Sequence, residues 1–233
     1  MDKVSPSASA ALDGLADGAS LAVGGFGLSG VPNTLIEAVL ARGTRGLHVV
    51  SNNCGVDGGG LGILLAAGRI ARVTGSYIGD NKEFARQYLA GELAVELVPQ
   101  GTLAERLRAG GCGVPAFYTP AGVGTPAAEG KEVRSFDGRD HVLEHSLTTD
   151  FALVRAHRGD RHGNLVFRKS SRNFNPLAAM AGRIAVAEVE HLVEPGGLDP
   201  DEVHLPGVFV QRVVALTPGQ AVTGIEKRTV RGR

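Results

Sequence analysis

The sequence has few cysteines and no excess of charge of either sign. Only Cys54 and Cys112 occur among 233 residues, and they do not form a C-x-x-C pair. Free thiols in a reducing compartment are therefore expected rather than a disulfide framework. Lysine and arginine together number 24, as do aspartate and glutamate, so the formal net charge is zero. Because no basic stretch stands out, a nucleic-acid partner is not expected.

Long apolar runs are also absent. The longest spans residues 61–67, is interrupted by Gly62, and is far shorter than the roughly 20 residues needed to cross a bilayer. The first fifteen residues lack the apolar core of a signal peptide and the arginines of a transit peptide. We therefore expect a cytoplasmic protein that has no membrane partner.

The sequence shows no pattern typical of a metal site or of a nucleophile with its base. His141 and His145 would lie about 13 Å apart in a strand, too far to share one ion. The remaining histidines, His48, His157, His162, His191 and His204, are scattered. Ser170-Ser171 lies in no nucleophile elbow, and Cys112 has no histidine beside it in the sequence. We expect no metal and no catalytic residue of the serine or cysteine type.

Strand and helix signals alternate through the first half of the chain. Buried strands are predicted at residues 20–23, 47–50, 70–74 and 93–98. Helix starts are indicated by Pro32, by Leu61, by Asp80 with Glu83, and by a capping box of Thr102 with Glu105. The alternation predicts an α/β fold with an open, mainly parallel sheet flanked by helices. A single domain over residues 1–233 fits the length.

The second half is richer in strands. Residues 110–126 contain many glycines and prolines and predict a long ordered loop. Asp137-Gly138 is a strong type I′ turn signal for a hairpin over residues 132–144. Further strands are predicted at 151–157, 165–169, 184–193 and 208–216, with a short helix beginning at Pro176. The C-terminal half is therefore expected to be β-rich.

A glycine-rich stretch follows the first predicted strand. Residues 25–30 read G-x-G-x-x-G, the pattern of a dinucleotide-binding loop. Such a site also needs an acidic residue about 20 positions later to bind the ribose. Here the second strand ends in Ser51-Asn52-Asn53, so the sequence argues against a nicotinamide cofactor. A turn that only packs a strand tightly against a helix stays an alternative.

Three predicted strands end in loops that could form a binding site together. Ligands of parallel sheets bind beyond the carboxyl ends of the strands. Residues 24–32 offer backbone N–H groups suited to an oxyanion, a phosphate or a thioester carbonyl. Asn52, Asn53 and Gln100 offer amides that can donate hydrogen bonds to a carboxylate. The alternatives are that the asparagines only cap a turn and that Gln100 is an ordinary surface residue.

These stretches carry a resemblance to a known family. DGASLAVGGFGLSGVP, residues 17–32, resembles the first signature of the family I coenzyme A transferases, with its core G-G-F-x-x-x-G-x-P. The resemblance continues through SNNCGVDGGGLG, ELAVELVPQGTLAERLRAGGCGVPAFYTPAGVGT, DFALVRAHRGDRHGNLVFRKSSRNFNP and LPGVFVQRVV. Nearly the whole chain is covered, and the sequence resembles the A-subunit of the 3-oxoacid branch.

The resemblance implies a function shared between two different chains. Such enzymes move CoA from succinyl-CoA to a 3-oxo acid through a glutamate on the B-subunit, whose S-E-N-G-type motif is missing here. This chain would then have no catalytic residue and no cofactor, with the coenzyme A thioester as substrate. Its partner would be the B-subunit, in a heterodimer or heterotetramer. The expected substrate-binding residues are Asn52, Asn53, Gln100 and Gly101. The expected CoA or oxyanion loop comprises Gly24, Gly25, Phe26, Gly27 and Gly30, although Phe26 is equally compatible with a core position.

The acceptor acid stays open between acetoacetate and 3-oxoadipate. The second differs by a distal carboxylate, which a cation would bind, and Arg86, Arg168 and Arg172 are candidates for it. Two functions of other classes are kept as alternatives. One is an NAD-binding oxidoreductase, and the other is a module that binds a phosphosugar without a partner.

Overall fold

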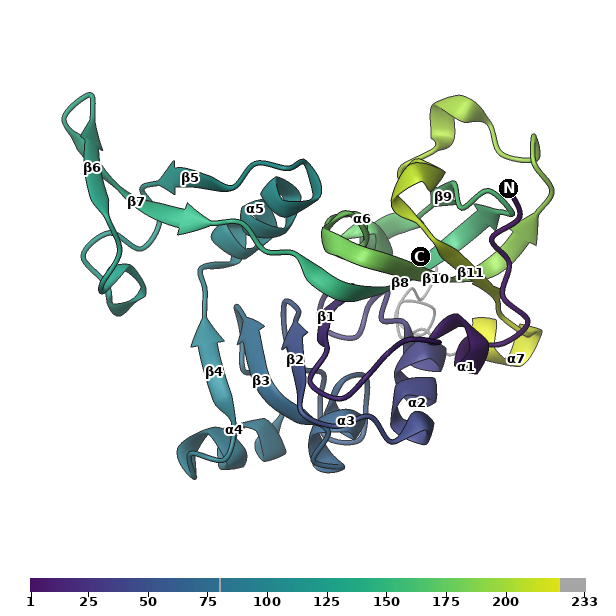
Figure 1. Ribbon diagram of the computed structural model, residues 1–233, viewed down its shortest axis with the longest axis horizontal. Helices are drawn as coiled ribbons and strands as arrows, with labels where there is room; N and C mark the ends of the chain where they lie inside the picture. Colours follow the sequence, from purple (N-terminus) through teal and green to yellow (C-terminus); the bar gives the residue numbers. More distant parts are fainter. Residues whose placement is uncertain (80, 223–233) are drawn as a thin grey trace, which may run out of the picture.

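The computed structural model describes residues 1–79 and 81–222, and its centre is one large sheet (Figure 1). The sheet has eight strands in the order β11-β10-β8-β1-β2-β3-β4, with β9 paired to β8. All neighbours along this order are parallel, and only β9 runs antiparallel to β8. The strands are β1 (Ser20–Val23), β2 (Leu47–Val50), β3 (Ile70–Gly75), β4 (Ala94–Leu97), β8 (Thr149–Asp160), β9 (Leu165–Val166), β10 (Gly182–Val193) and β11 (Arg212–Ala215). The prediction of an open, mainly parallel sheet is confirmed.

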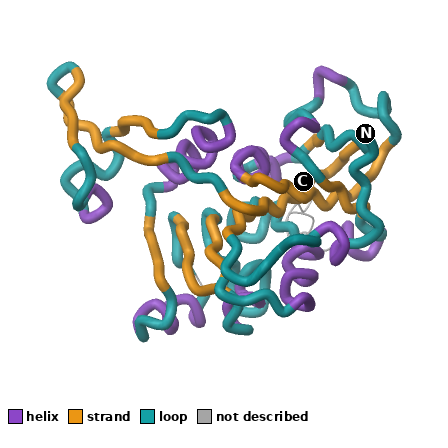
Figure 2. The backbone as a smooth tube through the Cα atoms, in the orientation of Figure 1, coloured by secondary structure: helices purple, strands orange, loops and turns teal. Residues whose placement is uncertain are grey.

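Helices cover both faces of this sheet (Figure 2). Successive residues of a strand point to opposite faces, so the central strands bury apolar side chains on both. Leu21 and Leu153 belong to one buried cluster, whereas Ala22 and Val154 belong to the other. The first cluster includes residues of α1 (Ala8–Ala11), α2 (Asn33–Arg42), α3 (Gly62–Ala66) and α4 (Lys82–Leu89). The second includes residues of α5 (Gln100–Gly111) and α6 (Asn175–Ala181); α7 (Pro218–Ala221) follows β11.

The order of the strands reverses next to β1. From β1 the chain adds β2, β3 and β4 on one side, and later adds β8, β10 and β11 on the other. The carboxyl ends of β1 and β8 therefore flank a topological switch point. Open α/β sheets bind ligands in the crevice at such a point. The fold thus places the loop that follows β1 where a ligand site is expected.

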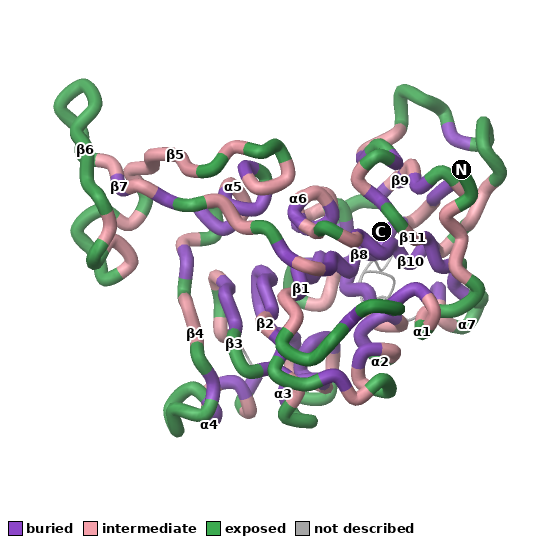
Figure 3. Tube along the Cα trace, viewed as in Figure 1, coloured by how far each residue is buried: buried purple, intermediate pink, exposed green. Residues whose placement is uncertain are grey.

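A three-stranded antiparallel sheet projects from the body of the molecule (Figure 1). It consists of β5 (Ala116–Thr119), β6 (Val133–Phe136) and β7 (Arg139–His145), and every residue of β6 is exposed (Figure 3). Asp137 and Gly138 have φ of 50° and 76°, so the predicted hairpin is confirmed. The long loop predicted at 110–126 is wrong, because β5 lies within it and pairs with β7.

Arg106 joins this small sheet to the main one. Its Nη1 donates to Glu96 of β4 at 2.7 Å, and its Nε donates to the backbone oxygen of His145 at 2.8 Å. Glu144, 3% exposed, lies 3.9 Å from Arg106 and accepts a hydrogen bond from Lys131. Two buried charges, those of Arg106 and Glu144, and two half-buried ones, those of Glu96 and Lys131, therefore meet where β7 leaves the body.

Some predicted element ends differ from the structure. Helix α2 begins after Pro32, as predicted, and ends at Gly43, which has a left-handed conformation. The capping box of Thr102 and Glu105 is wrong, because α5 already begins at Gln100. The hydroxyl of Thr102 is buried without a hydrogen-bond partner among the described residues. The strand predicted at 208–216 is shorter, since residues 207–209 form a 3₁₀ turn.

The cap of α4 is Asn81. The predicted cap, Asp80, lies outside the described residues. Asn81 Oδ1 accepts from the N–H of Phe84 at 2.9 Å, and its Nδ2 donates to the backbone oxygen of Cys54 at 2.9 Å. One buried side chain therefore starts a helix and fixes the glycine-rich loop after β2. No described helix is long and apolar enough to cross a membrane.

Replacing Asn81 with alanine should lower the free energy of unfolding by about 2–4 kcal/mol, because a helix cap is lost and the Cys54 carbonyl is left buried without its donor. Ser7→Ala removes the exposed cap of α1 and is the matched control, with an expected loss of about 1 kcal/mol. Urea titration followed by circular dichroism measures both. Equal losses would show that the link to Cys54 contributes nothing.

Candidate functional site

The glycine-rich loop after β1 is a tight turn tied to the neighbouring strand. Gly24 donates its N–H to the backbone oxygen of Leu153 in β8 at 2.9 Å. Phe26 and Ser29 exchange two backbone hydrogen bonds of 3.0 and 2.9 Å. Gly25, Gly27 and Gly30 have φ of 116°, 59° and 68°, which side chains rarely adopt. The N–H groups of Phe26 and Ser29 are therefore bonded within the turn. The oxyanion hypothesis requires N–H groups that can donate to a ligand, and these two cannot.

Phe26 is not a core residue. It is 49% exposed, so the core alternative is wrong for this side chain. Tyr77, which follows β3, is 60% exposed and forms a backbone bridge with Asn53. Two aromatic side chains are therefore left partly uncovered in loops that follow strands of the parallel sheet.

The three predicted amides meet at the carboxyl edge of the sheet. Asn52 and Asn53 come two and three residues after the end of β2 and are buried. Gln100 begins α5 and is exposed, as its alternative interpretation as a surface residue expects. Gln100 Nε2 donates to Asn52 Oδ1 at 2.6 Å, and Asn52 Nδ2 donates to Asn53 Oδ1 at 3.3 Å. Asn53 Nδ2 in turn donates to the backbone oxygen of Gly27 at 3.4 Å. The loops after β1, β2 and β4 are thus linked into one hydrogen-bonded cluster, as their positions in the sequence suggested.

Ser76 belongs to this cluster and was missed by the sequence analysis. Its hydroxyl donates to Oδ1 and to the backbone oxygen of Asn52, at 2.9 and 3.1 Å. Its position directly after β3 was the available signal. Gly101 is the second residue of α5, and a Cβ added there would meet nothing within 4 Å.

The space beside the glycine-rich loop is small. A cavity of about 10 Å³ lies among Gly25, Gly27, Ser51 and Asn53, which is room for one water molecule. No described carboxylate forms a hydrogen bond with Asn52, Asn53 or Gln100. The amides are therefore assembled, but the part of the chain that the structure describes places no acidic nucleophile on them.

A model of the family described as Coenzyme A transferase matches residues 6–216. The chain belongs to the coenzyme A transferase family. It is 61% identical to the A-subunit of the succinyl-CoA:3-ketoacid coenzyme A transferase of Xanthomonas campestris, over 96% of this chain and 92% of the relative. It is 59% identical to a protein of Mycobacterium tuberculosis named as the probable A-subunit of the same transferase, over 99% of this chain and all of that one.

Solved structures agree with the fold. An acyl-CoA transferase from Escherichia coli O157:H7 superposes with a TM-score of 0.82 at 23% identity. The match covers 94% of this chain and 48% of the E. coli chain, so this chain spans about half of that longer one.

In this CoA-transferase chain, the side chain of Asn175 fixes the glycine-rich loop to β8. It is fully buried at the start of α6. Its Nδ2 donates to the backbone oxygens of Gly30 and Ser171, at 3.0 and 2.8 Å, and its Oδ1 accepts from the N–H of Arg155 in β8 at 3.0 Å. A Cβ added at Gly24 would lie 2.0 Å from Asn175 Oδ1. The glycine at position 24 therefore makes room for this amide.

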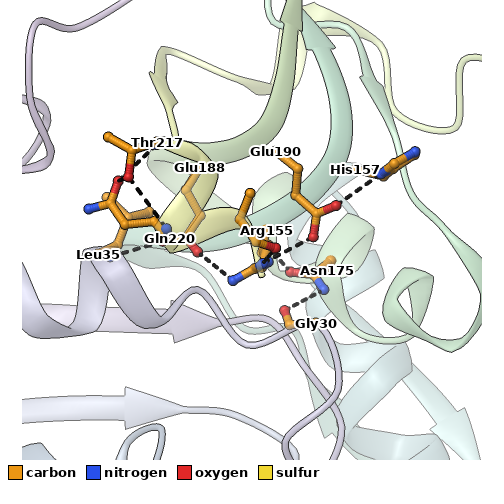
Figure 4. Close-up of polar contacts among 10 residues, drawn as sticks. Gly30, Leu35, Arg155, His157, Asn175, Glu188, Glu190, Thr217 and Gln220 are labelled. Atoms are coloured by element: carbon orange, nitrogen blue, oxygen red, sulfur yellow. Dashed lines mark hydrogen bonds and ion pairs between the residues drawn. The ribbon is translucent and has the colours of Figure 1, made fainter. Parts of the chain in front are cut away.

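A buried ion-pair network lies next to Asn175 (Figure 4). Arg155 Nη2 donates to Glu190 at 3.0 Å, and its Nη1 lies 3.4 Å from Glu188. Glu188 Oε2 accepts from the N–H of Leu35, in the first turn of α2, at 2.9 Å. Pro32, at the N-cap position, has no side chain that could accept a hydrogen bond from the first turn of α2. Glu188, on β10, is that acceptor instead. Complete burial raises the pKa of Glu188 to about 8, while the charge of Arg155 acts in the opposite direction.

His157 and His191 are not scattered, contrary to expectation. Their rings are 5.0 Å apart, and one ligand atom from each lies within 4.8 Å of a carboxylate oxygen of Glu190. Both oxygens of Glu190 already accept hydrogen bonds, one from Arg155 and one from His157 Nδ1 at 2.9 Å. That the chain holds no metal stays a prediction.

The two cysteines lie in different environments. Cys54 is fully buried, and burial raises the pKa of its thiol to about 12. Cys112 is exposed, 3.7 Å from the guanidinium of Arg108, at the end of α5.

Gly24→Ala should lower the free energy of unfolding by about 1–3 kcal/mol, because the added methyl group overlaps Asn175. Gly101→Ala, in open space on a helix, is the matched control and should stabilise the chain by up to about 1 kcal/mol. Thermal unfolding measures both. A Gly24→Ala variant as stable as the wild type would contradict a rigid contact between loop and amide.

Glu188→Gln should change how stability depends on pH. The raised pKa means that the folded wild type keeps a proton that the unfolded chain releases, so its stability falls as pH rises from about 4.5 to about 8. Glutamine has no such titration. The unfolding free energy of the wild type, relative to that of the variant, should fall across this window by up to about 5 kcal/mol. Urea titrations at pH 5, 6.5 and 8 test this, and parallel pH profiles would contradict it.

Proposed function

We propose that this chain is the A-subunit of a succinyl-CoA:3-oxoacid CoA-transferase and binds the acid substrate with its amide cluster. The observation that carries the proposal is the convergence of Asn52, Asn53 and Gln100 beside the glycine-rich loop. Side-chain amides are uncharged and can donate hydrogen bonds to a carboxylate. Such binding suits a substrate acid that must also be released after the reaction. The relatives named above support the choice of reaction.

The catalytic glutamate would come from the B-subunit. In the expected double displacement, the glutamate carboxylate attacks the thioester carbonyl and expels CoA as thiolate. The thiolate then attacks the glutamyl carbonyl of the resulting anhydride, releasing succinate and leaving a glutamyl-CoA thioester. The 3-oxo acid accepts CoA by the same two steps in reverse. Dividing the exchange in this way replaces one difficult displacement by easier ones.

Three observations support a shared site. The relatives are named as A-subunits, and this chain spans about half of the E. coli transferase chain. The cavity beside the glycine-rich loop, about 10 Å³, is too small for a carboxylate substrate. Phe26 and Tyr77 are left exposed in the surrounding loops, where a partner chain would cover them. We propose a heterodimer or heterotetramer in the cytoplasm, with the site completed at the boundary between its two kinds of chain.

Acetoacetate is the proposed acceptor. Arg86, one candidate for a second carboxylate, is bound to Glu83 and Glu92 and is not free for 3-oxoadipate, which leaves Arg168 and Arg172 as the remaining candidates. The names of the relatives, succinyl-CoA:3-ketoacid coenzyme A transferases, support the choice of acetoacetate. No feature of the described residues favours an oxidoreductase, because no acidic residue follows β2 where a ribose would bind.

The proposal is tested by assaying CoA transfer with this chain alone and with the co-expressed B-subunit. Succinyl-CoA is the donor, and acetoacetate and 3-oxoadipate are the acceptors. Activity is expected only from the pair, with mass spectrometry finding the CoA adduct on the B-subunit. Activity or an adduct on this chain alone would overturn the division of labour. A preference for 3-oxoadipate would overturn the acceptor.

Gln100→Leu should raise KM for the acid about 10- to 100-fold, because one hydrogen bond to a charged group is worth roughly 1.5–3 kcal/mol. Assembly with the B-subunit should be unchanged. Gln87→Leu is the matched control: Gln87 bonds to the backbone oxygen of Leu65, so its loss should affect stability and not KM. Steady-state kinetics with the acid varied measure the effect. An unchanged KM in Gln100→Leu would refute carboxylate binding by the cluster.

A further inference from the structure

A basic segment, Arg168–Arg172, lies against the glycine-rich loop. It follows β9 and forms a 3₁₀ turn over Lys169–Arg172. The hydroxyls of Ser170 and Ser29 are 3.1 Å apart, and Asn173 Nδ2 donates to the backbone oxygen of Ser29 at 3.1 Å. Asn175 connects the segment to the loop, because its amide donates to the backbone oxygens of Gly30 and Ser171. Hydrogen bonds therefore fix the position of the segment relative to the glycine-rich loop.

The cations of this segment have no partner among the residues that the structure describes. Among the described arginines, only four side chains form no hydrogen bond or ion pair with another described residue: Arg45, Arg139, Arg168 and Arg172. Arg168, Lys169 and Arg172 are all exposed, and Lys169 has no such partner either. Three like charges within five residues repel one another, which favours a bound anion. The positive charge of Arg172 also adds to burial in lowering the pKa of His204.

The backbone of the segment is strained. Lys169 has a φ of 50°, in the left-handed region, and the only other described non-glycine residue in that region is Asp137 in the hairpin turn. A lysine rarely adopts this conformation unless its surroundings impose it, and such strain gathers at ligand sites. Here the hydrogen bonds of Ser170, Ser171 and Asn173 impose it.

We propose that Arg168, Lys169 and Arg172 bind the phosphates of coenzyme A. The inference rests on the proposed function, which places the thioester beside the glycine-rich loop. Coenzyme A carries a pyrophosphate and a 3′-phosphate at the far end of its long pantetheine arm, so a phosphate site must lie outside the thioester site, at a distance that this arm can span. Arginine binds phosphate through paired N–H groups. Binding energy gained at this remote end can be used at the reacting carbonyl.

The test compares two donors with the assembled enzyme. Succinyl-CoA carries the phosphates, and succinyl-pantetheine lacks them. In Arg168→Gln/Arg172→Gln, kcat/KM for succinyl-CoA should fall about tenfold for each arginine. The value for succinyl-pantetheine should stay within about twofold of wild type, because the lost contacts are not made with that donor. Arg45→Gln/Arg139→Gln removes the two other unpaired arginines and should leave both donors unchanged.

Direct binding gives a second readout that needs no turnover. Adenosine 3′,5′-bisphosphate, titrated calorimetrically into the complex of this chain with its partner, should bind more weakly to the Arg168/Arg172 variant than to wild type. The Arg45/Arg139 variant should bind it as wild type does.

Four outcomes would overturn the proposal. Equal losses with both donors would mean that the segment acts on folding or assembly. The variant could instead change the preference between acetoacetate and 3-oxoadipate while the ratio of kcat/KM for succinyl-CoA to that for succinyl-pantetheine stays as in wild type. This would mean that the cations bind the distal carboxylate of the acid. Equal binding of the bisphosphate to wild type and variant would exclude a phosphate site. A wild-type complex that does not use succinyl-CoA would refute the proposed function itself, and this inference with it.

Discussion

The buried amide of Asn175 is the contact on which the site depends. It reaches the glycine-rich loop after β1, the strand β8 and the basic segment at once. Each partner is a buried backbone group, and a buried backbone group needs hydrogen bonds of this kind. Its oxygen also occupies the space that a side chain at position 24 would fill. One side chain thus determines where the loop lies relative to the sheet.

The switch point explains why the polar groups gather there. Because β1 lies between β2 and β8, the loops on its two sides diverge and leave a crevice at the carboxyl edge. The glycine-rich loop after β1 contacts the amide of Asn53 there, in the cluster to which Gln100 also belongs. The basic segment contacts the same loop through Ser29. Glu188 and Arg155 stiffen the region behind the loop, where Glu188 caps α2 from a neighbouring strand. The chain therefore offers a preorganised surface rather than an enclosed pocket.

Family membership says more about the reaction of this chain than its fold does. The fold alone does not specify a reaction, since one structural neighbour with a TM-score of 0.77 is a decarboxylase. What narrows the chemistry is the set of side chains at the edge of the sheet. Neutral amides without an adjacent described nucleophile suit a half-site, and the buried Cys54 thiol, with its raised pKa, offers no alternative nucleophile.

The sequence by itself determined the alternation of strands and helices, the start of α2 after Pro32, the hairpin at Asp137-Gly138 and the loop that holds Asn52 and Asn53. These features follow from local periodicity and backbone preference. It could not reveal that β5 pairs with β7 or that Asn175 supports a loop 145 residues away. It also could not reveal that Arg86 is paired while Arg168 has no partner among the described residues. Those facts depend on contacts between residues distant in the chain. Only the tertiary structure decided them, since packing selects partners that no short stretch of sequence specifies.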